Sequence, residues 1–187
     1  MSTHPQQRFA SPSRSLSLLL HATGLASFLA SFKHLSQYDM PIANAYGGYS
    51  QFLTILSLAV STVTFAVAVV ADLTLNSTLF SIKNKLAVVT APVEVLVALM
   101  YWGIFAYDPQ LLFPDEFRMP IIADIGFHAM PGIVLSLDVL FFSPPWTISA
   151  SSMLALSNVL AFLYWAWVEQ CYTHNGWYAA FLVRRIS

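Results

Sequence analysis

The sequence predicts an all-α integral membrane protein, a polytopic transmembrane helical bundle with about five spanning helices. Charged residues make up only 9% of the chain and hydrophobic residues 57%, and the mean hydropathy is +0.66. A soluble domain usually carries about 25% charged residues. This fraction of charged residues is too small to cover the surface of a soluble globular protein, whereas a lipid bilayer can surround such a chain.

Five apolar stretches follow one another, each about as long as the 20 residues that cross a bilayer core. Short connections separate them, which favours one compact bundle over two domains. We expect a polar N-terminal tail over 1–14, the bundle over 15–173 and a short interfacial tail over 174–187. The stretches are 15–32, 49–73, 86–107, 120–142 and 148–172.

The orientation is predicted from lysine and arginine, which are enriched on the cytosolic side of membranes. Because the first helix usually dominates, we expect a cytosolic N-terminus and a cytosolic connection at 74–85. The terminal Arg184–Arg185 pair falls on the other side after five crossings. The residues that support the cytosolic assignment are Arg8, Arg14, Lys83 and Lys85.

Several function classes have no support in the residues. The formal net charge is −1, which gives no reason to expect a nucleic-acid partner. Cys171 is the only cysteine, so neither an internal disulfide nor a multi-cysteine metal site is possible. No phosphate-binding glycine loop and no Gly-x-Ser-x-Gly motif occurs. Paired haem ligands would have to be His21 and His128, and we expect no metal or other cofactor.

The fourth apolar stretch carries the most suggestive polar residues. Asp124 and His128 are four residues apart and therefore share one helical face, and Asp138 follows about 40° away on that wheel. An aspartate that accepts a hydrogen bond from one imidazole nitrogen fixes the tautomer and leaves the other nitrogen free as a base. Pro131–Gly132 follows at once and is expected to loosen the backbone and make room for a ligand.

Other interpretations of these residues are open. His128 could simply hydrogen-bond a neighbouring helix. Alternatively, Asp124, His128 and Asp138 could form the proton relay of a small transporter, since ionisable groups inside a membrane often mark such paths.

Polar residues also occur in the first three stretches. Glu94 in the third is expected to lie within a few turns of the membrane surface, and His21 in the first is expected to be a packing residue. In the second stretch small hydroxyl residues and one acid share a face, as at many membrane helix interfaces. These are Thr54, Ser57, Ser61 and Asp72.

Short motifs on successive helices carry a family resemblance. Tyr46-Gly47-Gly48 precedes Phe52-Leu53-Thr54, and Asp72-Leu73 closes that stretch. Ala106-Tyr107-Asp108 ends the third stretch, Gly126, His128 and Asp138 lie in the fourth, and Asn175-Gly176-Trp177-Tyr178 follows the fifth. In order and placement this pattern, over about residues 15–180, resembles the androgen-induced-gene/ADTRP family of multipass membrane hydrolases.

The resemblance implies a function. The family consists of intramembrane threonine hydrolases that cleave fatty-acid esters of hydroxy fatty acids. Its nucleophilic threonine falls on Thr54 and its catalytic histidine on His128, and Asp124, Asp138 and Glu94 are expected to support them. The expected partners are a lipid ester substrate and membrane lipids, and the expected location is the endoplasmic reticulum or another endomembrane.

Two differences from the family pattern affect these expectations. Family members have a sixth membrane helix after the Gly-Trp-Tyr segment, and we expect that helix to be missing here. Animal members have Asn at the position of Asp124 and a second His at the position of Ile125, so the orienting role of Asp124 rests on the residues alone. A non-catalytic scaffold or lipid-binding protein is the alternative to a hydrolase.

Overall fold

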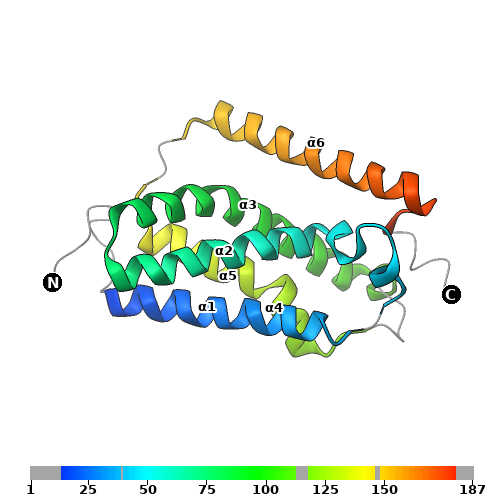
Figure 1. The fold of residues 1–187 in the computed structure, drawn as a ribbon, viewed down its shortest axis with the longest axis horizontal. Helices are drawn as coiled ribbons and strands as arrows, with labels where there is room; N and C mark the ends of the chain where they lie inside the picture. The colour runs from blue at the N-terminus through cyan, green and yellow to red at the C-terminus, as the bar shows by residue number, and fades with distance from the viewer. Residues whose placement is uncertain (1–13, 39, 113–117, 146–147, 180–187) are drawn as a thin grey trace.

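The computed structural model describes residues 14–38, 40–112, 118–145 and 148–179. In this part of the chain all regular structure is helical. The long helices are α1 (Arg14–Leu35), α2 (Leu53–Thr74), α3 (Ser77–Tyr107) and α6 (Ala150–Asn175) (Figure 1). The shorter α4 (Ile121–His128) and α5 (Met130–Leu137) follow α3 and precede α6 in the chain. The expected tails at 1–14 and 174–187 lie mostly outside the described residues.

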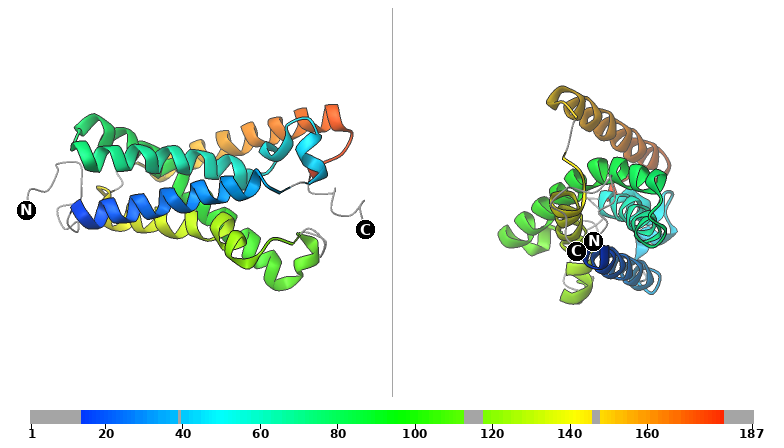
Figure 2. Two further views of the ribbon diagram at one scale, coloured as in Figure 1. Left: turned by 60° about the horizontal axis from the view of Figure 1, so that its bottom comes forward. Right: turned by 90° about the vertical axis from the view of Figure 1, so that its left-hand side faces the viewer.

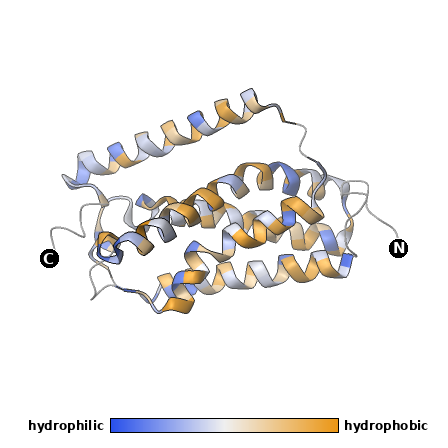
Figure 3. Cartoon of the chain, turned by 180° about the vertical axis from the view of Figure 1, so that it is seen from behind, coloured by the Kyte–Doolittle hydropathy of each residue, from blue (hydrophilic) through white to orange (hydrophobic). Residues whose placement is uncertain are grey.

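Four of these helices are long and apolar enough to cross a membrane. The bent pair of α4 with α5 and the π-helical turn η5 (Asp138–Phe142) makes a fifth candidate if it counts as one span. Hydrophobic residues recur along the helices (Figure 3), and some of them are exposed: Val63 is 55% and Leu99 69% exposed. An outer surface of this kind suits lipid. The predicted all-α membrane bundle is therefore confirmed.

Helices α1, α2, α3 and α5 form the packed body, in which α2 contacts both α1 and α3, and α3 contacts α5 (Figure 2). Phe28, Phe65 and Phe127 lie in its buried core. Gly24 allows α1 to approach α2, because a Cβ atom there would lie 2.5 Å from the ring of Phe65.

The connection between α2 and α3 is much shorter than the predicted loop at 74–85. Leu75 ends α2 in the left-handed region with φ of 56°, and the Asn76 side chain accepts hydrogen bonds from the amides of Thr78 and Leu79 at the start of α3. Asn76 is therefore a helix N-cap. The predicted loop was wrong because the polar residues after Asn76 belong to the first turns of α3 and do not interrupt the helix.

Helix α6 stands apart from the packed body (Figure 2). Cys171 is its only buried residue. It is held near the short 3-10 turn η2 (Gly48–Gln51), where Gly47 has a φ of 84° and a Cβ would lie 2.6 Å from the Cys171 sulfur. Turn η2 and the preceding turn η1 (Pro41–Asn44) cover the end of the bundle where α2 begins.

Candidate functional site

A cavity of about 570 Å³ lies where α2, α3, α4 and α6 approach the η1–η2 cap. Thr54 and His128 both line it, although 74 residues separate them in the chain. The remaining walls are mostly apolar and aromatic. An apolar cavity with a few polar groups is the usual form of a small-molecule site.

Thr54 lies in the first turn of α2. The amides of Ile55 and Leu56 donate to the carbonyl of Phe52, the N-cap residue, which starts the helix here. Two carbonyls of η2 accept side-chain donors from α6: Gln51 O from the Tyr164 hydroxyl and Ser50 O from Trp167 Nε1, both at 3.0 Å. These bonds fix the start of α2, and with it the position of Thr54.

His128 ends α4 and is held by three neighbours. Its Nδ1 lies 2.8 Å from Asp124 Oδ1, its ring stacks on Tyr101 with centroids 3.5 Å apart, and its carbonyl accepts a hydrogen bond from Trp102 Nε1 at 3.2 Å. The Asp124 contact implies a proton on Nδ1. Nε2 makes no hydrogen bond to any described residue. His128 lines the cavity, and its Nε2 is therefore available to accept a proton there.

The position of His128 depends on a break in the helix. Helices α4 and α5 meet at Ala129 with a bend of 43°, and Pro131 follows in the first turn of α5. Proline has no amide hydrogen and therefore cannot continue the hydrogen-bond ladder of α4. Trp102 Nε1 donates to the carbonyl of His128 beside this break.

Thr54 and His128 share the cavity without a direct hydrogen bond between them in the described structure. We therefore predict that the two side chains interact through one water. Both residues are close to helix ends: Thr54 is the second residue of α2, and His128 lies seven residues after the start of α4, about 10 Å at 1.5 Å per residue. The cavity therefore lies toward the end of the bundle at which α2 begins.

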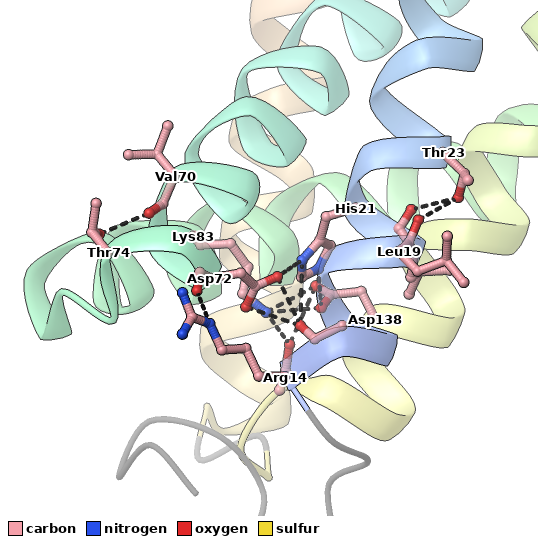
Figure 4. Close-up of polar contacts among 12 residues, drawn as sticks. Arg14, Leu19, His21, Thr23, Val70, Asp72, Thr74, Lys83 and Asp138 are labelled. Atoms are coloured by element: carbon pink, nitrogen blue, oxygen red, sulfur yellow. Dashed lines mark hydrogen bonds and ion pairs between the residues drawn. The ribbon is translucent and has the colours of Figure 1, made fainter. Parts of the chain in front are cut away.

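A second polar cluster lies at the other end of α2 (Figure 4). His21 Nδ1 lies 2.6 Å from Asp72 Oδ2, and His21 Nε2 lies 2.9 Å from Asp138 Oδ1. Lys83 Nζ donates to the same Asp138 oxygen at 2.8 Å. Ser17 donates to Asp72 at 2.9 Å. We call this group the charge network, and its members Ser17, His21, Asp72, Lys83 and Asp138 are all at most 1% exposed.

The charge network corrects three expectations. Asp138 does not join Asp124 and His128, because the bend at Ala129 between them changes the helical phase on which the wheel argument relied. Lys83 is a buried partner of Asp138 inside α3 and not a loop residue. His21 bonds two carboxylates and is not a simple packing residue. No hydrogen bond between described residues links the two clusters.

Glu94 and the hydroxyl face of α2 connect helices. Ser61 Oγ donates to Glu94 Oε1 at 2.6 Å and joins α2 to α3, while Ser57 Oγ donates to the carbonyl of Thr54 at 3.2 Å. Glu94 is 1% exposed and does not line the cavity of Thr54. Its support for the site is therefore indirect, through the packing of α2 against α3.

Sequence reasoning missed the aromatic residues around the site. Tyr101, Trp102 and Tyr164 contact His128 or the start of α2. Aromatic residues near helix ends are common as membrane-interface anchors. The sequence alone holds no signal that distinguishes an aromatic residue that anchors the protein at the interface from one that contacts His128 or the start of α2.

Comparison with known proteins agrees with the family resemblance. A family model described as FAR-17a/AIG1-like protein matches residues 16–180. A UPF0641 membrane protein of Schizosaccharomyces pombe is 37% identical over 172 residues, covering 90% of this chain and 77% of the relative. The human Androgen-induced gene 1 protein is 30% identical over 169 residues, covering 80% of this chain and 67% of the relative. No solved structure matches. The chain is therefore a multi-pass membrane protein that belongs to the FAR-17a/AIG1-like family.

Proposed function

We propose that this protein is an intramembrane hydrolase of lipid esters, such as fatty-acid esters of hydroxy fatty acids, with Thr54 as nucleophile and His128 as base. One observation carries the proposal. Thr54 and His128 line the same apolar cavity, and Asp124 occupies Nδ1 of the imidazole so that Nε2 is left to accept a proton.

The proposed reaction has two halves. His128 Nε2 takes the hydroxyl proton of Thr54 as the oxygen attacks the ester carbonyl carbon, and the imidazolium then gives that proton to the departing alcohol. An acyl-threonine remains. Water attacks it, His128 takes a proton from the water and returns it to the Thr54 oxygen, and the fatty acid leaves.

The surroundings of His128 fit this role. Asp124 stabilises the imidazolium that forms after each proton transfer, and stacking on Tyr101 keeps the ring in one plane. Because the walls of the cavity are apolar, they suit the hydrocarbon part of an ester.

The test is labelling of purified, membrane-inserted protein with a fluorophosphonate probe, together with hydrolysis of a long-chain ester. The wild-type chain and the Ser61→Ala variant should react, since Ser61 lies two turns beyond Thr54 outside that cavity. Thr54→Ala should not react. Equal labelling of Thr54→Ala and wild type would refute the threonine assignment.

For the membrane orientation we propose a cytosolic N-terminus and a cytosolic α2–α3 connection in an endomembrane such as the endoplasmic reticulum. Arg14 supports this, because its guanidinium donates to the carbonyls of Asp72 and Leu73 at the same end of the bundle. Asn76 begins a glycosylation sequon, Asn76-Ser77-Thr78, and should carry no glycan in this orientation. A glycan on Asn76, detected as an endoglycosidase-sensitive mass shift, would show the opposite orientation.

A further inference from the structure

A second apolar hollow of about 260 Å³ lies between α2, α3 and α6, and we call it the α6 groove. Leu53, Leu56 and Val60 of α2 form one wall, and Val93 of α3 and Leu160 of α6 face it. In the described structure α6 is hydrogen-bonded to the body only through its second half, by Tyr164, Trp167 and Asn175.

The α6 groove adjoins the cavity of Thr54 and His128. Tyr164 lines both, and the neighbours Leu53 and Thr54 at the start of α2 line one each. From Leu53 the groove follows α2 to Val60, which lies about 10 Å further along the helix at 1.5 Å per residue. The groove therefore leads from the depth of Thr54 toward the middle of the bilayer.

The described lining offers no free hydrogen-bond donor to a ligand, since Tyr164 and Trp167 donate to the carbonyls of Gln51 and Ser50. The hydroxyls of Ser57 and Thr90 line the groove, but each donates to a carbonyl within its own helix, at 3.2 and 2.7 Å. A headgroup or a polar peptide would lose its hydrogen bonds with water here without replacement. Hydrocarbon is therefore the ligand chemistry that fits the groove. The groove is open at its side, where the lining residue Leu163 is 58% exposed, so hydrocarbon can enter from the surrounding lipid.

We infer that the α6 groove binds one long hydrocarbon chain of the ester substrate and admits it sideways from the bilayer, while the ester carbonyl lies at Thr54. Tyr164 forms the wall that the chain passes. The inference rests on the proposed function and adds to it a site that selects esters by chain length.

Two matched variants of α2 test the groove. Val60 lines it, whereas Val63, 55% exposed, lines neither hollow. Val60→Phe should lower kcat/KM for p-nitrophenyl palmitate about tenfold, as expected when a pocket loses room for part of a chain, and leave p-nitrophenyl butyrate unchanged. Val63→Phe should leave both esters unchanged. Equal effects of Val60→Phe on both esters, or none on either, would overturn the inference while Thr54-dependent butyrate hydrolysis keeps the proposed function intact.

A measurement without turnover separates the two proposals. Trp167 lines the groove, so in the inactive Thr54→Ala background a palmitate ester brominated on its chain should quench the tryptophan fluorescence that is lost in Trp167→Phe. Val60→Phe should weaken this quenching and Val63→Phe should not. Quenching no stronger than by brominated phospholipid would mean ordinary bilayer lipid only and would overturn the inference, whether or not the protein hydrolyses esters.

Discussion

The two histidines buried in the bundle, His21 and His128, differ in how many ring nitrogens already have a carboxylate partner. Asp72 and Asp138 take both nitrogens of His21, whereas Asp124 takes only Nδ1 of His128. An imidazole with two acceptors has no lone pair left for a substrate proton, and one with a single acceptor does. The same residue types thus build the charge network, a structural clamp, at one end of α2 and a candidate catalytic base at the other.

The clamp and the candidate site also differ in their surroundings. His21 is completely buried among charged and hydroxyl groups from α1, α2, α3 and η5. His128 is 6% exposed and lines a cavity. We therefore expect changes at the clamp to alter stability and changes at the cavity to alter chemistry.

The largest expected effect is on turnover. Thr54→Ala and His128→Ala should each lower kcat for p-nitrophenyl butyrate by about 10⁴-fold or more, because either change removes covalent catalysis. The double variant should be no worse than the single ones, since the two residues act as a unit. Melting temperatures should stay within a few degrees of wild type. Additive losses in the double variant would show that the residues act independently.

Breaking the clamp should cost stability instead. Lys83→Met leaves Asp138 buried with one cation fewer and should lower the free energy of unfolding by about 3–5 kcal/mol. Denaturation in mixed micelles measures this loss, and kcat of the folded fraction should be almost unchanged. The double variant Lys83→Met/Asp138→Leu should recover part of the stability. A large fall in kcat without loss of stability would contradict the separation of clamp and site.

An intermediate effect is expected for Asp124→Asn. The amide keeps the size of the side chain but removes the charge that stabilises the imidazolium, so kcat should fall by about 10²-fold while stability changes little. This loss is smaller than that of His128→Ala because the base itself remains. If the variant has wild-type kcat, Asp124 has no part in positioning or charging His128.

The smallest effect is expected between α2 and α3. Ser61→Ala removes the 2.6 Å hydrogen bond to Glu94 and should cost about 1 kcal/mol of stability with unchanged kcat. Urea or micelle denaturation of the variant gives the first value and butyrate hydrolysis the second. A fall in kcat comparable to that of Asp124→Asn would instead place Ser61 and Glu94 in the chemistry.

The helices and the Asp124–His128 pair could be predicted from the sequence because both depend on local spacing. Apolar length predicts a span, and residues four apart share a face. The partners of His21 could not be predicted, since Asp72 and Asp138 lie 51 and 117 residues away and only packing brings them together. Asp138 was misplaced for a related reason: a helical wheel assumes a continuous helix, and Pro131 interrupts it.

The pair of Lys83 and Asp138 has a consequence for biogenesis. The two residues are 55 positions apart, which a ribosome working at about 5–20 residues per second needs roughly 3–11 s to cover. During that interval α3 holds an ammonium group without its carboxylate, near enough to the helix start for the long side chain to reach the lipid headgroups. His21 and Asp72 already have each other once α2 emerges. We therefore expect the nascent bundle to close in two stages, with the Lys83 ammonium group drawn inward when Asp138 arrives.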